Sequence, residues 1–173
     1  MSDSQMLDAA LEYARLGWYV FPVHGIRDGR CSCGADCGSP GKHPRIKGWP
    51  NVATTDPQTI ARWWRQWPYA NIGCACGPSG LLVLDVDPRH GGDKSLEHLE
   101  GLHRRFYQTR ARTGGNGLHL FFKKPAGVTV KSRPNALGNG YPGIDIRADG
   151  GFIVLPPSLH ASGKRYDWEQ GSS

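Results

Sequence analysis

The amino-acid sequence predicts an α+β fold built on a mixed or largely antiparallel sheet with flanking helices. Three segments have apolar residues at helical spacing, and short apolar runs alternate with Gly, Pro and Asn turns. The late runs follow one another without an intervening helical segment, which antiparallel strands allow and parallel strands do not. Glycine accounts for 24 of the 173 residues, about twice the usual share of ~7%, so many tight turns are expected.

Local signals place the individual elements. Either Thr55 or Asp56 is the expected cap of the second helix, and Pro57 lies in its first turn. A Gly-Pro-Ser-Gly turn predicts that the apolar runs on either side of it form a hairpin. The predicted helices cover residues 5–16, 55–67 and 94–106. The predicted strands cover residues 18–23, 71–77, 81–87, 109–113, 117–123, 143–148 and 151–157.

Length and composition favour a single globular domain over residues 1–173. The formal net charge of +6 is compatible with a polyanionic partner, although many basic proteins bind none. No run approaches the ~18 apolar residues of a membrane helix. The N-terminal segment also lacks the basic start of a signal peptide. We therefore expect no membrane partner and a cytoplasmic location.

A long Gly- and Pro-rich segment at about residues 24–48 needs something to order it. It contains four residues whose close spacing suits a tetrahedral, structural Zn²⁺ site, with His24 as an alternative fourth ligand. Free cysteines in an unstructured loop are the other interpretation. The crowded thiols indicate a reducing compartment rather than disulfides. The predicted zinc ligands are Cys31, Cys33, Cys37 and His43.

Two further cysteines, Cys74 and Cys76, alternate with Ala75 on a predicted strand. We interpret them as small buried residues rather than as a second metal site.

The run "LLVLDVD" predicts a buried strand that ends in two acids. Residues two apart on a strand share a face, so Leu82, Leu84 and Val86 lie on one face, and Asp85 and Asp87 on the other. Two carboxylates this close repel unless a cation or a proton lies between them. Hard oxygen ligands suit Mg²⁺ or Mn²⁺. Taken alone, the pair is equally typical of a strand end that opens into a turn.

Two later strands carry polar groups opposite their apolar residues. In "GLHLFF", His119 lies on the face opposite Leu118 and Leu120, and in "GIDIR" Asp145 shares a face with Arg147. Each alone has a structural interpretation, as a hydrogen-bonded core histidine or as an exposed strand face. Together with the acid pair they predict a site with three carboxylates for metals and two cationic groups for anionic oxygens.

These motifs, in the order "LDVD", "GLHLFF" and "GIDIRADGGFIVLPPS", resemble the three motifs of the archaeo-eukaryotic primase superfamily. They are most similar to the bifunctional primase–polymerase (prim-pol) domains of phages, plasmids and mobile elements. "GKHP" and "GPSGLLVLDVD" are also similar, so the resemblance covers about residues 6 to 168. It implies an RRM-like sheet with flanking helices, the archaeo-eukaryotic primase fold, often with a zinc-binding element.

The resemblance also implies a biological setting. Such domains are commonly fused to a helicase, and this chain stops at "YDWEQGSS" directly after a strand-like segment. We therefore expect it to be part of a larger, helicase-fused protein of a prokaryotic cell or a phage-infected cell.

The activity implied is that of a DNA primase/polymerase, transferring a nucleotide from an NTP or dNTP to a 3′-hydroxyl on a single-stranded DNA template. In the family the motif acids hold two divalent ions, Mg²⁺ or Mn²⁺, and these acids match Asp85, Asp87 and Asp145. The motif histidine, which contacts the triphosphate, matches His119. The second motif is often Ser-x-His, whereas this chain has Gly117 at the serine position.

The missing serine hydroxyl directs attention to other phosphate partners. The Asn116 side chain, or backbone amides of the glycine-rich turn at residues 114–117, are possible substitutes because glycine permits close approach to phosphate. On physical grounds alone, the candidate phosphate partners are Arg112, Lys123 and Arg147.

Two other functions remain open from the sequence. A metal-dependent nuclease would use the same three acids, although no Lys or Glu general base stands beside the acidic motif. A non-catalytic, zinc-bearing nucleic-acid-binding module is the second alternative. Trp63, Trp64 and Trp67 share a predicted helix with Arg62 and Arg65 and have the composition of a base-stacking surface. Their helical spacing instead favours a buried stripe.

Overall fold

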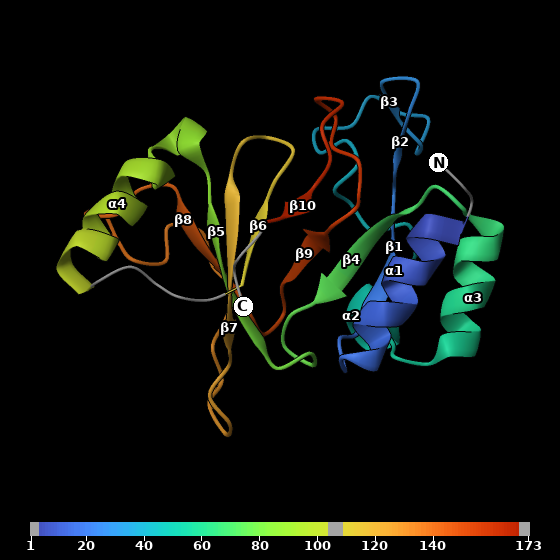
Figure 1. The fold of residues 1–173 in the computed structure, drawn as a ribbon, viewed down its shortest axis with the longest axis horizontal. Coiled ribbons are helices and arrows are strands. Elements are labelled where there is room, and N and C mark those ends of the chain that lie inside the picture. Colours follow the sequence, from blue (N-terminus) through green and yellow to red (C-terminus); the bar gives the residue numbers. More distant parts are fainter. Residues whose placement is uncertain (1–3, 104–108, 170–173) are drawn as a thin grey trace.

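The computed structural model describes residues 4–103 and 109–169 and shows two antiparallel sheets side by side (Figure 1). Helices α1 and α3 pack together against the smaller sheet, and α4 packs against the larger one. The described helices are α1 (Ser4–Arg15), α2 (Trp49–Val52), α3 (Pro57–Gln66) and α4 (Gly92–His103), with a 3-10 helix η1 (Pro88–His90). The described strands are β1 (Val20–Val23), β2 (Ile26–Arg27), β3 (Arg30–Cys31), β4 (Asn71–Ala75), β5 (Leu81–Val86), β6 (Arg110–Arg112), β7 (Leu118–Lys123), β8 (Ile144–Arg147), β9 (Phe152–Leu155) and β10 (Asp167–Trp168).

The strand order is β1-β4-β9 in the smaller sheet and β10-β6-β7-β5-β8 in the larger one. A short pair, β2 and β3, lies in the cysteine-containing segment. Every ladder between named strands is antiparallel. The α+β class with antiparallel sheets is therefore confirmed, whereas the RRM-like arrangement and the primase fold stay predictions.

The predicted hairpin between residues 71–77 and 81–87 is wrong, because β4 and β5 belong to different sheets. β4 pairs with β1 and β9, and β5 pairs with β7 and β8. The turn between them is present, and the Leu81 amide donates to the Cys76 carbonyl at 2.9 Å. Each of the two strands lies between two partners, so neither is an edge strand, and the turn passes the chain from one sheet to the other.

Helix α3 follows its sequence signals closely. Asp56 is its N-cap and accepts a hydrogen bond from the Thr59 amide at 2.8 Å, with Pro57 in the first turn. Trp64 is 1% exposed and donates through its indole nitrogen to the Ala70 carbonyl. The buried interpretation of the tryptophan stripe is thus confirmed, since its two other members, Trp63 and Trp67, are partly buried against the same core.

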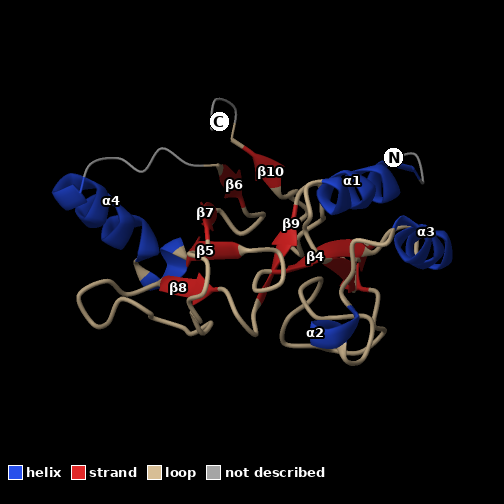
Figure 2. Ribbon diagram, turned by 90° about the horizontal axis from the view of Figure 1, so that it is seen from below, coloured by secondary structure: helices blue, strands red, loops and turns tan. Residues whose placement is uncertain are grey.

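The larger sheet has two different faces. On one face Leu84 and Val86 pack with Leu96 and Leu99 of α4. On the other face Val83 joins a core shared with the smaller sheet. Figure 2 shows α4 at the opposite end of the molecule from α1 and α3. The face that carries Val83 is therefore turned toward the smaller sheet.

Two other expectations concern the end of the third predicted helix and membrane-spanning helices. Helix α4 begins at Gly92 and is described to His103, so the predicted Phe106 lies outside the described residues. Within the described ranges, no helix combines the length and apolar character that a bilayer crossing requires.

Asn71 connects three parts of the chain from a position that is 1% exposed. Its side-chain amide donates to the carbonyls of Gly41 and Leu159, and its side-chain oxygen accepts from the Leu159 amide, each at 2.9 Å. The cysteine-containing segment is held in this way to β4 and to the chain after β9.

We expect Asn71→Ala to lower the free energy of unfolding by about 1–3 kcal/mol, because buried backbone groups lose their partners. Chemical denaturation measures the change. Asn51→Ala, at an exposed position on α2, is the matched control and should leave stability nearly unchanged. Equal stability of the two variants would contradict this role of Asn71.

Candidate active site

The register of the larger sheet places three of the predicted site residues in one row. Asp85 on β5 lies directly opposite His119 of β7 on one side and Asp145 of β8 on the other. Side chains at directly opposed positions have Cβ atoms about 4.5–5.5 Å apart. The alternation that was read separately on three strands thus converges on one row of the sheet, on the face turned toward the smaller sheet.

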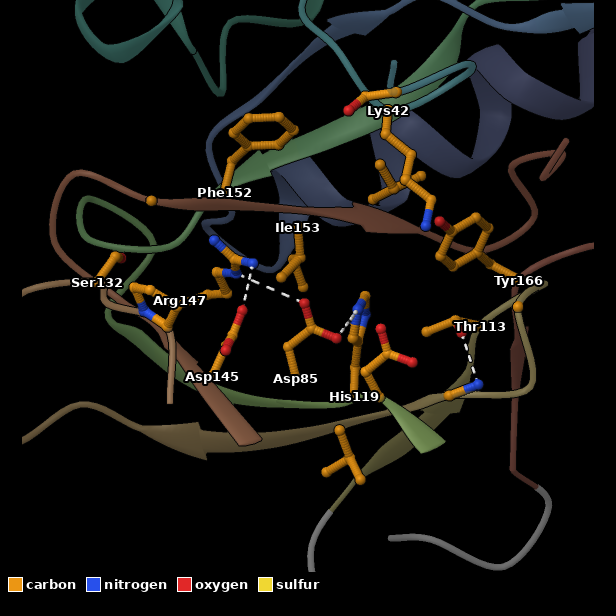
Figure 3. A pocket seen from close by; sticks show the side chains of 18 of the residues that line it. Lys42, Asp85, Thr113, His119, Ser132, Asp145, Arg147, Phe152, Ile153 and Tyr166 are labelled. Atoms are coloured by element: carbon orange, nitrogen blue, oxygen red, sulfur yellow. Dashed lines mark hydrogen bonds and ion pairs between the residues drawn. The ribbon is translucent and has the colours of Figure 1, made fainter. Parts of the chain in front are cut away.

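Arg147 and His119 hold the Asp85 carboxylate from two directions (Figure 3). The His119 Nε2 atom lies 3.5 Å from Asp85 Oδ1, and Arg147 Nε lies 3.5 Å from Asp85 Oδ2. The same guanidinium also bonds Asp145 Oδ2 at 2.8 Å. Burial alone would raise the pKa of Asp85, but the bond and charge of His119 together with the charges of Arg147 and Lys42 lower it overall. Asp85 is therefore ionised at neutral pH.

The two ring nitrogens of His119 differ in their contacts, since only Nε2 faces Asp85. Its side chain is 6% exposed, and its Nδ1 atom is buried without a hydrogen-bond partner among the described residues. A buried polar atom of this kind costs free energy unless something satisfies it.

Asp87 lies beyond the end of β5, where it caps η1. Its carboxylate accepts from the Arg89 backbone and guanidinium at 2.8–3.0 Å and lies 3.0 Å from His90 Nδ1. The hydrogen bonds from Arg89, helped by His90, place the pKa of Asp87 well below its ordinary value. The start of η1, rather than strand alternation, therefore sets the position of Asp87, which borders the same cavity as Asp85.

The row of polar residues forms one wall of a cavity of about 620 Å³, which lies between the two sheets. This volume falls in the range of about 300–1,000 Å³ that is typical of small-molecule sites. The ionisable residues that line it are Lys42, Asp85, Asp87, Arg89, His119, Arg133, Asp145, Arg147 and Tyr166.

The three acids do not form a compact ligand set in the described part of the chain. Arg147 lies between Asp85 and Asp145, and Arg89 covers Asp87. Each acid is therefore neutralised by a protein cation. The donor chemistry, three carboxylates bordering one cavity, fits Mg²⁺ or Mn²⁺, and Asp85, Asp87 and Asp145 are the residues that would hold such ions.

Of the predicted phosphate partners, His119 and Arg147 line the cavity, and the glycine-rich turn at residues 114–117 reaches it through Gly115 and Gly117. Arg112 pairs across the sheet with Leu118 and therefore shares the opposite face; it bonds Glu169 at 2.7 Å and borders a separate hollow. Asn116 borders that hollow too, and its side chain accepts from Lys164. Arg112 and Asn116 therefore lie outside the site, Arg112 because of strand alternation and Asn116 because of the direction of its turn.

Lys123 is also placed away from the row. It is exposed, pairs with Leu81 and lies four residues along β7 from His119, roughly 13 Å on strand geometry.

Other residues reach the cavity that the sequence motifs did not single out. Arg89 directly follows the Asp-x-Asp-Pro turn, and Lys42 lies next to the predicted zinc ligand His43. Position beside a motif is the signal that could have found both. Thr113 and Tyr166 also line the cavity. Thr113 directly precedes the glycine-rich turn at residues 114–117, so the same signal could have found it, whereas nothing local in the sequence marks Tyr166.

A second ligand cluster lies in the segment that contains β2 and β3. Cys31, Cys33, Cys37 and His43 each offer a ligand atom, and these atoms all lie within 4.8 Å of one another. Tetrahedral zinc with Zn–S bonds of about 2.3 Å separates its sulfur ligands by ~3.8 Å. His24 instead contacts Ser32 and stacks on His43 with ring centroids 4.5 Å apart. The predicted ligand set is therefore the one brought together, and the alternative His24 is not part of it.

The thiol chemistry of this cluster also fits a metal. Desolvation would raise the pKa of Cys31, but hydrogen bonds from the Cys33 and Gly41 amides and from His43 lower it to about 6. Desolvation and the neighbouring sulfurs raise the pKa of Cys37 to about 11. Sulfurs this close cannot all be thiolates unless a cation lies among them. Zinc is the cation that such a cysteine and histidine set usually binds.

A sequence model of the family described as bifunctional DNA primase/polymerase, N-terminal, matches residues 10–172. The chain belongs to this Prim-Pol family. No curated protein matches it. Membership confirms the resemblance seen in the three motifs and supports DNA primase/polymerase activity, a nucleotidyltransferase activity, at the level of the family. Prim-Pol proteins are typically metal-dependent. The phage or plasmid type stays a prediction.

The Prim-Pol geometry explains why glycine stands at position 117. A Cβ there would lie 2.6 Å from the Val86 carbonyl oxygen and 2.9 Å from Thr113 Oγ1. The Thr113 hydroxyl accepts a hydrogen bond from the Gly117 amide at 2.9 Å and lines the cavity. A hydroxyl from a neighbouring residue thus fills the space that a serine side chain would need.

The remaining cysteines of the Prim-Pol domain behave as expected for core residues. Cys74 and Cys76 are both fully buried within the core shared by the two sheets.

We expect the purified Prim-Pol domain to contain one zinc ion per chain, and Cys37→Ser to reduce this content severalfold because a thiolate ligand is lost. Inductively coupled plasma mass spectrometry measures the zinc. Cys74→Ala is the control and should retain it. Equal zinc contents in wild type and Cys37→Ser would contradict the assignment.

Proposed function

We propose that the domain catalyses template-directed nucleotidyl transfer from an NTP or dNTP to a 3′-hydroxyl during replication priming. The observation that carries this proposal is the row in which Asp85 is flanked by His119 and Asp145 inside a nucleotide-sized cavity. Family membership supports the same reaction class.

In this proposal the acidic residues bind metal ions, and the histidine contacts the triphosphate. Asp85, Asp87 and Asp145 would hold two divalent ions. When bound, these ions lower the pKa of the attacking hydroxyl and neutralise charge on the leaving pyrophosphate. His119, which lines the cavity and has an unpartnered, buried Nδ1, would orient a triphosphate oxygen. No protein nucleophile takes part.

Thr113 and Arg147 support the substrate in this scheme. The Thr113 hydroxyl accepts one hydrogen bond from Gly117, so its own hydrogen remains free for a phosphate oxygen. Arg147 bonds both Asp85 and Asp145. Where divalent ions instead neutralised those acids, the Arg147 guanidinium would be able to contact a phosphate.

Partners follow from the family and are proposals of the same kind. Single-stranded DNA is the expected template, in keeping with the formal net charge of +6. A fused or associated helicase is the expected neighbour. Zinc in the cysteine cluster would have a structural role, because its four protein ligands leave no coordination position open.

We expect Asp85→Asn and Asp145→Asn each to reduce incorporation of labelled nucleotide on a primed single-stranded template by at least ~100-fold, because a metal-binding charge is lost. Gel analysis of Mn²⁺-dependent extension measures it. Asp8→Asn, an exposed change on α1, is the control and should retain full activity.

The same gels separate this proposal from its alternatives. Strands that shorten without added nucleotide would identify a nuclease. A template affinity that does not change with Mn²⁺ or nucleotide, together with no extension by wild type, would identify a non-catalytic binding module. Full synthesis by Asp85→Asn would contradict the assignment of the acids as metal ligands.

Arg147→Gln should bind Mn²⁺ several times more tightly than wild type in the absence of nucleotide, because the guanidinium no longer competes for Asp85 and Asp145. The same variant should bind a nucleoside triphosphate more weakly in the presence of Mn²⁺. Isothermal titration calorimetry measures both affinities. Arg133→Gln is the control, since Arg133 lines the cavity but donates to the Ala136 carbonyl. Weaker Mn²⁺ binding by Arg147→Gln would contradict the competition.

A further inference from the structure

One residue belongs to both the zinc cluster's segment and the cavity. Lys42 directly precedes the cluster residue His43 in the sequence, and it lines the cavity that contains Asp85. In Figure 3 the Lys42 side chain points into the cavity from the side opposite Asp85 and Asp145. The cysteine-containing segment therefore supplies a positive group that faces the acids across the cavity.

The backbone around Lys42 is fixed on both sides. The Gly41 carbonyl accepts from the buried Asn71 side chain at 2.9 Å, and the Gly41 amide donates to the Cys31 sulfur at 3.4 Å. On the other side, the His43 carbonyl accepts from the His24 amide at 2.9 Å. Lys42 itself donates its amide to a carbonyl three residues earlier. Its position is set by the fold of the segment rather than by contacts of its own side chain.

The ammonium group of Lys42 has no hydrogen-bond or ion-pair partner among the described residues, although the residue is half-buried. The other strong cations of the cavity, Arg89, Arg133 and Arg147, are each bonded to an acid or to a backbone carbonyl. A cation that is partly desolvated, carried on a well-anchored backbone and unpaired is positioned to recognise an anionic ligand.

We propose that Lys42 contacts a phosphate of the bound nucleoside triphosphate, and that the zinc cluster keeps it in place. The proposal rests on the proposed function, which puts a nucleotide in this cavity. It adds the residue that meets the phosphates from the side opposite the acids, and it gives the zinc segment a part in substrate binding. The zinc site and the nucleotide site then act as one unit.

Calorimetry in the presence of Mn²⁺ tests the contact, with ATP and AMP as probes. Lys42→Met keeps most of the stem and removes the charge, so ATP affinity should fall at least ~10-fold, as expected for a lost charged hydrogen bond. AMP affinity should change little, because it lacks the outer phosphates. Lys47→Met, an exposed change in the same segment, is the matched control and should bind ATP like wild type.

The outcomes separate this proposal from the proposed function. If wild type binds neither ATP nor AMP, the nucleotide site and the Lys42 contact both fall. If wild type binds ATP and Lys42→Met binds it equally well, the Lys42 contact alone is overturned. Equal losses for ATP and AMP would also overturn it, since they indicate a general defect of the cavity.

A double-mutant cycle tests the link to zinc. Cys37→Ser should weaken ATP binding in the wild-type background and have little further effect in Lys42→Met. Equal losses in both backgrounds would overturn the link. Far-UV circular dichroism checks that the variant folds, and Cys33→Ser takes its place if it does not.

Discussion

The antiparallel pairing of β5 with β7 and β8 is the interaction on which the site depends. Because side chains on opposed strand positions share a face, one register places Asp85 beside both His119 and Asp145. A slip of one residue in either ladder would turn one of these groups toward α4 and into an apolar core. The packing of Leu84 and Val86 against α4 therefore protects the register, and the hydrophobic core and the polar row are two consequences of one pairing.

Burying acids on a sheet face requires compensating cations, and the cavity shows how this is arranged. Arg147 comes from the strand next to Asp85, while Arg89 comes from the turn that follows it. Both cations are therefore local in sequence or in sheet position. Arg147, together with His119, lowers the pKa of Asp85, and Arg89 lowers that of Asp87, so these two acids are ionised at neutral pH. Lys42 differs, because it is brought by a separate segment and remains unpaired in the described structure.

The two sheets share an apolar core, in which Val83 and Phe121 of the larger sheet lie with Ile72 of the smaller one. Asn71 bonds the segment carrying the cysteine cluster to β4 and to the chain after β9. The far wall of the cavity, which includes Lys42 and Phe152, is thus attached to the smaller sheet, and the acids to the larger one. A nucleotide bound between them would contact both halves of the molecule, so binding and the relative position of the sheets are expected to be linked.

The sequence by itself determined which residues of a strand share a face and which segment holds the candidate metal ligands, while the tertiary structure selected His43 over His24. Both are local properties: strand alternation has a period of two, and short spacings keep Cys31, Cys33, Cys37 and His43 together. Only the tertiary structure decided which strands pair and which cations reach the cavity. The apparent hairpin of β4 and β5 was divided between two sheets because each strand is buried among more distant partners. The pairing of Arg112 with Leu118 puts Arg112 on the face away from the cavity. Lys42 reaches the cavity on a loop that Asn71 holds through Gly41. Both placements depend on contacts between distant segments, which no local sequence pattern predicts.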